Sequence, residues 1–167
     1  SRCGFADIQA TAFVHPRAVP NMADAEAVLA GIRRQPGVEY SALIPNYRGF
    51  QRAVQVGVKR VELTLSATDS HNINNMNKTT EESLREIEQC LAAGGDTQLV
   101  VGLAVAFGCP FEGKYDNPSA AVNFLKDYVD AGMKTCCLCD TIGIADPAQV
   151  RAVIGAVKNA YPGLDLM

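Results

Sequence analysis

Short apolar runs alternate with helical patterns along nearly the whole chain, and this alternation limits the available folds more than any other feature. The apolar runs end at turn-forming or polar residues, and the segment after each run carries apolar residues at helical spacing. The runs lie at residues 5–13, 38–44, 60–66, 98–106 and 133–139, and residues 164–167 begin a sixth. Strands that are apolar on both faces and alternate with helices are typical of a parallel sheet. The sequence therefore predicts an α/β fold.

Two architectures fit five strand–helix units: an open doubly wound sheet, and part of an eightfold β/α barrel. One unit takes about 32 residues, so eight units would take about 255, close to the ~250 residues typical of the barrel. No Gly-x-Gly-x-x-Gly turn follows the first run, which disfavours a dinucleotide-binding open sheet. The chain also begins without Met and stops inside an apolar run. We therefore expect residues 1–167 to form a single partial (β/α)8 TIM barrel, with five strand–helix units and a strand stub.

Charge and hydropathy argue against two classes of partner. The formal net charge is -3 and no basic cluster is interleaved with aromatic residues, so we expect no nucleic acid partner. No apolar run approaches the roughly 18 residues that span a membrane, so we expect no membrane association. Cys136, Cys137 and Cys139 lie within one apolar run, where cysteine behaves as a small hydrophobic residue. The cysteine spacing lacks the paired motifs of a zinc site, and we expect reduced thiols in an intracellular protein.

Polar residues gather where the predicted strands end. Asp140 and Thr141 follow the fifth run, and Asp146-Pro147 then has the pattern of a helix start. The ends of the first two runs carry further amide and hydroxyl groups: Gln9, Thr11 and Asn46. In parallel α/β folds the carboxyl ends of the strands form the edge where catalytic and binding groups gather. Oxygen-rich side chains of this kind suit an oxygen-rich substrate and a hard divalent cation.

The residues alone leave a structural interpretation open for each of these features. Asp140 and Thr141 can simply shape a turn. Cys109 can be a reactive thiol or a structural loop residue, and the Asn-rich loop predicted at residues 67–78 can recognise a ligand or only hold turns. Both histidines fall in predicted loops, and no Ser-His-Asp arrangement can be assembled from the pattern.

Several longer motifs follow one another along the chain in a fixed order. They are Ile8–Pro16, Val19–Asp24, Pro45–Phe50, Asn75–Asn77 leading to Glu81–Ser83, Gly108–Gly113, and Asp140–Gly143. In this order they resemble the motifs of the hydroxymethylglutaryl-CoA lyase family, one of the metal-dependent lyase and synthase barrels that also include isopropylmalate synthase. The resemblance spans essentially the whole chain.

The resemblance implies an eightfold barrel of which this chain covers the second strand to the start of the seventh, without either end of the barrel. It implies retro-aldol cleavage of 3-hydroxy-3-methylglutaryl-CoA to acetyl-CoA and acetoacetate, the chemistry of leucine degradation and ketone-body formation. Mg²⁺ or Mn²⁺ would be the cofactor, with its direct ligands outside this chain.

The resemblance also assigns roles to residues of this chain. Asp140 would lie beside the metal and its bound water, and Asp140 and Gln9 are the expected catalytic residues. Thr11, Asn46 and Thr141 are the expected substrate-binding residues. An acyl-CoA substrate, a homodimer of the full-length protein, and a location in the cytoplasm or the mitochondrial matrix are further implications.

Several positions depart from the family pattern. The family carries Glu where this chain has Gln9, and a neutral amide cannot act as a base or balance the charge of a cation. The family also has Arg where this chain has Val100, and Gly where this chain has Cys139. A Ser-Cys pair of the family is replaced by Ala104 and Val105. Two alternatives therefore stand beside an active lyase: a catalytically impaired paralogue that binds acyl-CoA or a protein partner, and a condensing enzyme of the isopropylmalate synthase type. The open sheet edges of a partial barrel also predict that this chain alone is unstable or self-associates.

Overall fold

The computed structural model describes residues 3–167, and its central feature is one parallel sheet. Within these residues its six strands lie in the order β1-β2-β3-β4-β7-β8, and each neighbouring pair is parallel. The strands are β1 Asp7–Ala12, β2 Glu39–Ile44, β3 Arg60–Ser66, β4 Gln98–Ala104, β7 Thr135–Leu138 and β8 Asp165–Leu166. Spatial order follows chain order, without the reversal that defines a doubly wound sheet. A parallel sheet wound in one direction is the sheet of a β/α barrel.

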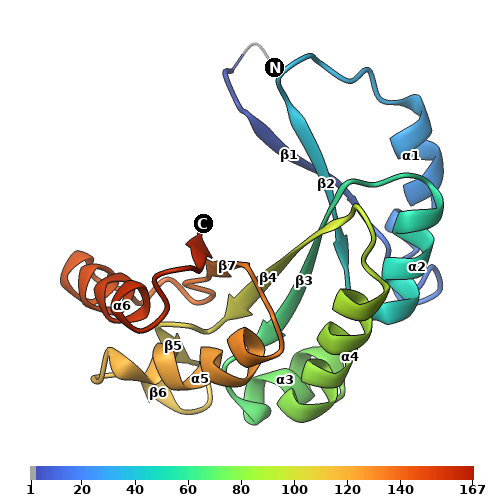
Figure 1. The fold of residues 1–167 in the computed structure, drawn as a ribbon. Helices are drawn as coiled ribbons and strands as arrows, with labels where there is room; N and C mark the ends of the chain where they lie inside the picture. The colour runs from blue at the N-terminus through green and yellow to red at the C-terminus, as the bar shows by residue number, and fades with distance from the viewer. Residues whose placement is uncertain (1–2) are drawn as a thin grey trace.

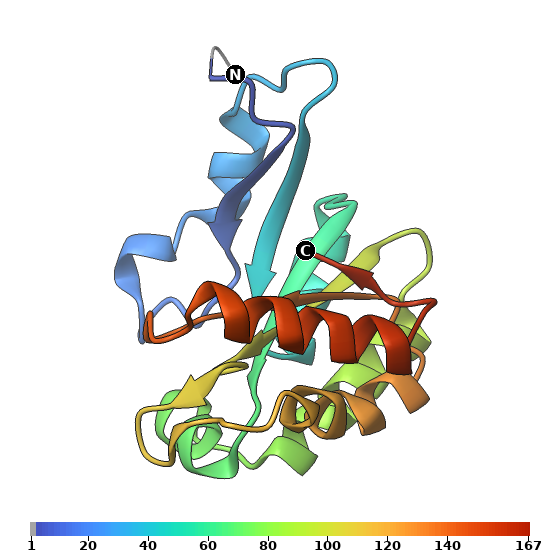
Figure 2. The ribbon, with the colours of Figure 1, turned by 90° about the vertical axis from the view of Figure 1, so that its left-hand side faces the viewer.

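The helices cover only one side of this sheet. Figures 1 and 2 show the strands as an arc, with the helices along its convex side and the concave side open. The α-helices of the described residues are α1 Ala25–Gly31, α2 Tyr47–Gln55, α3 Asp69–Met76, α4 Thr80–Ala93, α5 Ser119–Asp130 and α6 Pro147–Ala160, and the 3-10 turn η1 (Pro20–Met22) precedes α1. None of these helices is long and apolar enough to cross a membrane. The predicted partial barrel is therefore confirmed.

The two faces of the sheet differ in chemistry. Buried apolar side chains such as Leu63 and Leu103 form the core between the convex face and the helices. On β3 these apolar residues alternate with Arg60, Glu62 and other polar side chains, which therefore point to the concave face. The prediction that the strands are apolar on both faces holds for the buried part of β4 and is wrong for β3.

An ion-pair network lies at the amino end of the concave face. The guanidinium of Arg60 donates to the carboxylates of Asp7 on β1 and Glu39 on β2, at 2.6 and 3.0 Å. Arg60 is only 5% exposed, so these pairs compensate a charge that is largely removed from water. In β/α barrels the amino ends of the strands contribute to stability rather than to catalysis. This network joins the amino ends of β1, β2 and β3 through ion pairs.

Local sequence signals mark the starts of α4 and α6. Thr79 caps α4, since its Oγ1 accepts the Glu82 N–H at 3.1 Å and Glu82 Oε2 accepts the Thr79 N–H at 2.8 Å. This is a reciprocal capping box, for which the spacing Thr79-x-x-Glu82 is typical. Asp146 caps α6 by accepting the Gln149 N–H at 2.8 Å, and Pro147 occupies the first helical position.

The prediction of an Asn-rich loop at residues 67–78 is wrong, because most of that segment is α3. The helix begins at the capping residue Thr68 and ends at Asn77, whose φ of 55° is left-handed. Asn72 is fully buried, and its amide bonds backbone groups on both sides of α3 and a hydroxyl on α4. These tertiary hydrogen bonds outweigh the low helix propensity of asparagine.

The predicted loop after β4 also contains regular structure. A two-stranded antiparallel hairpin forms there, from β5 (Gly108–Cys109) and β6 (Gly113–Lys114). Gly108 fits closely there, since an added Cβ would lie 3.0 Å from the backbone Cα atom of Lys114 and 2.4 Å from the Cδ1 atom of Ile144. The hairpin therefore packs directly against the turn that follows β7.

Candidate active site

The turn after β7 places Asp140 and Thr141 at the carboxyl end of the sheet. The two carboxylate oxygens of Asp140 accept the N–H groups of Ile144 and Ala145, each at 3.1 Å. Thr141 Oγ1 accepts the N–H of Val105 at 2.8 Å. Both side chains therefore do shape the turn.

These contacts leave both groups able to bind a ligand. Asp140 and Thr141 are exposed. Each Asp140 oxygen accepts one bond and has capacity for another, and the Thr141 hydroxyl still has its proton to donate. The Thr141 contact also holds Val105 at a φ of 53°, a strained conformation for a β-branched residue. Strain of this kind clusters at functional sites.

A second polar cluster lies on the concave face and joins three strands. Gln9 Nε2 donates to Glu62 Oε2 at 2.5 Å, and Ser41 Oγ donates to Glu62 Oε1 at 2.8 Å. Glu62 was missed in the sequence analysis, although a carboxylate between Val61 and Leu63 is a visible break in an apolar strand. The structure therefore adds a carboxylate directly beside the position where the family pattern expects one.

Gln9 and Thr11 do not occupy equivalent positions. Strict alternation would put residues two apart on one face of β1. A register shift between them pairs Gln9 with Ser41 and Thr11 with Ala42, which are consecutive residues of β2. Thr11 is 8% exposed and its partner Ala42 belongs to the core. The bulge thus separates Thr11 from the cluster around Glu62.

Two thiols of β7 and its end lie in contact. The sulfur atoms of Cys137 and Cys139 are 3.9 Å apart. The hydrogen bond between them lowers the pKa of Cys137 to about 7, against the opposing effects of burial and of Glu62. The same hydrogen bond, followed by burial, raises the pKa of Cys139. Cys137 is therefore the more reactive thiol of the pair.

Cys109, in contrast, is a packed residue of the β5–β6 hairpin. It is 1% exposed. Its sulfur lies 3.3 Å from Thr68 Oγ1 and accepts a hydrogen bond from the backbone N–H of Phe111, with a nitrogen–sulfur distance of 3.4 Å. Burial raises the pKa of its thiol, but the hydrogen bonds led by Thr68 and Phe111 outweigh burial and leave the pKa lowered. The contacts favour the structural interpretation of this residue.

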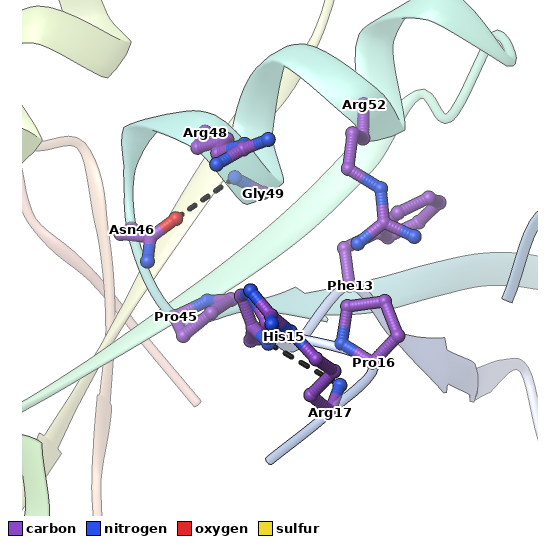
Figure 3. Close-up of a pocket in the computed structure, with 9 residues that line it drawn as sticks. All are labelled: Phe13, His15, Pro16, Arg17, Pro45, Asn46, Arg48, Gly49 and Arg52. Carbon is purple, nitrogen blue, oxygen red and sulfur yellow. Dashed lines mark hydrogen bonds between the residues drawn. The ribbon is translucent and has the colours of Figure 1, made fainter. Parts of the chain in front are cut away.

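Asn46 begins α2 at the carboxyl end of β2 and faces two neighbouring cavities. Its Oδ1 accepts the Gly49 N–H at 2.9 Å, which makes it the cap of α2. The first cavity, here called the cationic pocket, has a volume of about 410 Å³ and is drawn in Figure 3. It is lined by nine residues: Phe13, His15, Pro16, Arg17, Pro45, Asn46, Arg48, Gly49 and Arg52.

The second cavity, here called the apolar cavity, has a volume of about 530 Å³. Its lining is mainly apolar and includes Val14, Val19, Leu43 and Met76. The two cavities share three residues: His15, Pro45 and Asn46. They are therefore adjacent spaces at the carboxyl ends of β1 and β2.

The described residues do not complete a metal site. No group of three His, Cys, Asp or Glu side chains among residues 3–167 is placed to hold an ion. Asp140 is exposed and keeps free acceptor capacity. That the direct ligands lie outside this chain stays a prediction.

A parallel sheet wound in chain order, with helices outside and polar groups at the carboxyl ends of its strands, defines the β/α-barrel class of enzymes. Within that class the family is also clear. The HMGL-like family model matches residues 1–166, and the chain belongs to this family.

Known relatives and solved structures to which this chain is similar are hydroxymethylglutaryl-CoA lyases. The chain is 39% identical to hydroxymethylglutaryl-CoA lyase YngG of Bacillus subtilis, and 34% identical to the human mitochondrial hydroxymethylglutaryl-CoA lyase. These alignments cover 97% of this chain but 54% and 50% of the relatives, so the chain spans about half their length. An HMG-CoA lyase structure from Acinetobacter baumannii, in complex with coenzyme A and 3-methylmalate, matches with a TM-score of 0.87 at 36% identity. That match covers 98% of this chain and 54% of the lyase.

Proposed function

We propose that the full-length protein is a carbon–carbon lyase that cleaves 3-hydroxy-3-methylglutaryl-CoA to acetyl-CoA and acetoacetate. The observation that carries the proposal is the similarity to hydroxymethylglutaryl-CoA lyases along 97% of the chain, with Asp140 and Thr141 at the carboxyl end of the sheet. The A. baumannii relative binds coenzyme A, which supports an acyl-CoA substrate. A homodimer, located in the cytoplasm or the mitochondrial matrix, is part of the same proposal.

Mg²⁺ or Mn²⁺ is the proposed cofactor. When bound, such an ion polarises substrate oxygens and stabilises the negative charge that develops as the carbon–carbon bond breaks. Because the described residues supply no complete ligand set, the following roles concern only side chains of this chain.

Asp140 and Thr141 have binding roles in this proposal. The Asp140 carboxylate is fixed by two backbone N–H groups, so it presents its remaining lone pairs in one orientation. It would accept a hydrogen bond from a water or hydroxyl group held at the centre of the barrel. The Thr141 hydroxyl, fixed by the Val105 N–H, would donate to a substrate oxygen.

In this proposal Gln9 binds substrate and Glu62 accepts a proton, two roles that a single carboxylate can combine. Gln9 cannot remove a proton, but its amide oxygen can accept a hydrogen bond from substrate while its Nε2 group donates to Glu62. Glu62 is the carboxylate on this part of the concave face and can accept a proton. Cleavage requires a base for the substrate hydroxyl, and in this proposal Glu62 serves as that base.

An assay of acetoacetate formation from hydroxymethylglutaryl-CoA tests the proposal. The full-length protein with Mn²⁺ should turn over, and Asp140→Asn should lower kcat about 100-fold, in the range of one positioned catalytic group. Asp127→Asn, at an exposed position on α5, is the matched control and should leave turnover unchanged. Absence of acetoacetate from a metal-loaded, folded protein would refute the assigned reaction.

The neutral Gln9 favours the second candidate, a catalytically impaired paralogue that still binds acyl-CoA or a protein partner. Coenzyme A binding without cleavage would support that paralogue. The condensing-enzyme alternative predicts that the same protein preparation condenses acetyl-CoA with a keto acid. The lyase proposal predicts no such condensation.

A further inference from the structure

We propose that Cys137 and Cys139 are a peroxide-sensitive dithiol, which closes to a reversible disulfide on the concave face and lowers the turnover of the proposed lyase. The inference rests on the proposed function for its effect on turnover, whereas the oxidation itself needs only these two thiols. Cys139 stands where the family pattern has Gly, so the pair is a feature of this chain rather than of that pattern. It adds a modification site that takes no part in the cleavage steps.

The contact between the two thiols is the first observation. Their sulfur atoms are 3.9 Å apart, and the Cys139 thiol also donates to the Cys137 carbonyl oxygen at 3.7 Å. The proton of this contact therefore belongs to Cys139, and the Cys137 sulfur accepts it. Both residues are half-buried, so a small oxidant can reach them. This arrangement makes Cys137 the thiol that is oxidised first and Cys139 the thiol that resolves the product.

The direction of the side chains separates this pair from the third cysteine of the same apolar run. Cys136 is fully buried and belongs to the core between the sheet and the helices. Because side chains alternate along a strand, Cys137 and Cys139 point to the concave face. On the neighbouring strand β4 (Figure 1), Cys137 is paired with Gly102, which has no side chain to cover the thiol. The prediction that these cysteines behave as small hydrophobic residues therefore fits Cys136 best.

The backbone around Cys139 holds the pair in place and links it to Asp140. The Cys139 N–H donates to the Leu103 carbonyl at 3.0 Å, and the Cys139 carbonyl accepts the Ala106 N–H at 3.1 Å. Residues two apart in a strand have Cα atoms about 6.6 Å apart, near the upper limit of about 6.8 Å for a disulfide. Formation of the disulfide therefore has to move the backbone at Cys139, and Asp140 is the next residue.

A shift at this point of the chain reaches two groups of the proposed lyase. The orientation of the Asp140 carboxylate depends on the same turn, through its two backbone hydrogen bonds. The hydrogen bond between the thiols has the largest effect on the pKa of each, and the negative charge of Glu62 raises both values, so Glu62 lies within electrostatic reach of the pair. A displacement of about 1 Å can lower a rate about 100-fold, and we expect a loss of this size on oxidation.

The oxidation consumes one molecule of hydrogen peroxide for each pair. The Cys137 thiolate attacks the peroxide, an S–O bond forms as the O–O bond breaks, and the departing hydroxide takes up the proton that Cys137 released. The Cys139 sulfur then attacks the sulfenic acid of Cys137. The S–S bond forms, the S–O bond breaks, and the hydroxyl group leaves with the Cys139 proton as water. Two electrons pass from the sulfur atoms to the peroxide, and two waters are formed.

Two properties of the pair favour a reversible reaction. The hydrogen bond from Cys139 lowers the pKa of Cys137 to about 7, so a part of Cys137 is thiolate at neutral pH. The wide Cα spacing strains the disulfide, and strained disulfides are the ones that thiols reduce most readily. A dithiol such as dithiothreitol should therefore restore both thiols by exchange.

Mass spectrometry of the full-length protein tests the modification. The protein is treated with hydrogen peroxide, denatured, alkylated with iodoacetamide and digested with trypsin. The peptide of residues 135–151 should lose two hydrogens and carry its alkyl group on Cys136 alone, and dithiothreitol should restore all three thiols. Cys137→Ser and Cys139→Ser should each prevent the disulfide, and in Cys139→Ser the sulfenic acid of Cys137 should react with dimedone. Cys136→Ala is the matched control and should form the disulfide like the wild type.

Acetoacetate formation measures the effect on the site. Turnover by the wild type should fall about 100-fold as the disulfide forms and recover with dithiothreitol, whereas Cys137→Ser should keep its turnover in the same peroxide. Unchanged turnover of the oxidised protein, or an equal loss in Cys137→Ser, would overturn the regulation. Acetoacetate formation by a wild type that forms no disulfide would leave the lyase intact and refute the dithiol. A disulfide in a folded protein that makes no acetoacetate even when reduced would retain the modification site and refute the reaction.

Discussion

Replacing Gln9 with glutamate is the perturbation that most directly tests the cluster on the concave face. The family pattern carries Glu at this position, so Gln9→Glu is the natural attempt to restore a complete site. In this structure the new carboxylate would meet Glu62, which Gln9 Nε2 now contacts at 2.5 Å. The substitution removes a donor and places two negative groups together. We therefore expect Gln9→Glu alone to damage the protein.

The expected cost follows from two effects. Loss of a hydrogen bond to a charged group costs about 1.5–3 kcal/mol, and repulsion at a solvent-exposed pair adds about 1 kcal/mol. Because Gln9 is exposed, screening reduces both, and we expect the free energy of unfolding to fall by about 2–3 kcal/mol at neutral pH.

The pH dependence has a defined sign. The neighbouring carboxylate raises the pKa of the introduced carboxyl group in the folded state above its unfolded value of about 4.3. The folded state therefore holds this proton more tightly. The penalty is absent below the unfolded pKa and appears as the pH rises through the folded pKa.

Urea unfolding of the full-length protein at about pH 4 and about pH 7 measures this penalty. The exchange variant Gln9→Glu/Glu62→Gln restores one donor and one carboxylate, and it should recover most of the lost stability. It should also form acetoacetate, while Glu62→Gln alone should not. Unchanged stability of Gln9→Glu at neutral pH, or an exchange variant no more stable than Gln9→Glu, would refute the contact and the reasoning built on it.

Three further predictions concern other parts of the molecule. Asn72→Ala should lower the free energy of unfolding by about 3–5 kcal/mol in urea titrations, because several buried backbone groups lose their partner. Iodoacetamide should modify Cys137, whose pKa is about 7, much faster at neutral pH than Cys136, whose burial raises its pKa to about 12, and mass spectrometry of the modified peptides distinguishes them. The isolated chain of residues 1–167 should self-associate in ultracentrifugation, because β1 and β8 expose unpaired edges; a monomer that unfolds cooperatively would contradict this.

Features set by local sequence could be predicted well. The apolar runs located all six strands of the parallel sheet, and β3 has the predicted bounds. Capping signals at Thr79 and Asp146 located the starts of α4 and α6 because these side chains satisfy backbone groups only a few residues away. The order of these elements fits both a doubly wound sheet and a partial barrel, and the barrel is favoured by the length of one unit and by the missing Gly-x-Gly-x-x-Gly turn.

Features set by distant contacts could not be predicted in the same way. Asparagine is a poor helix former, so the composition of residues 67–78 indicated a loop. The hydrogen bonds that Asn72 makes across that segment and to α4 create the helix α3 instead. Likewise, the bulge in β1 that separates Gln9 from Thr11 depends on pairing with β2, which no periodicity within β1 reveals.

The Gln9–Glu62 contact shows why single positions mislead when a site is compared with a family pattern. Taken alone, Gln9 reads as the loss of a carboxylate. The structure places Glu62 in contact with it, and the register pairs Glu62 with Val100, the position where the family pattern has Arg. A carboxylate at position 9 on β1 or at position 62 on β3 faces the same part of the concave side. Positions 9 and 62 must therefore be exchanged together to test which of them the chemistry of the site requires.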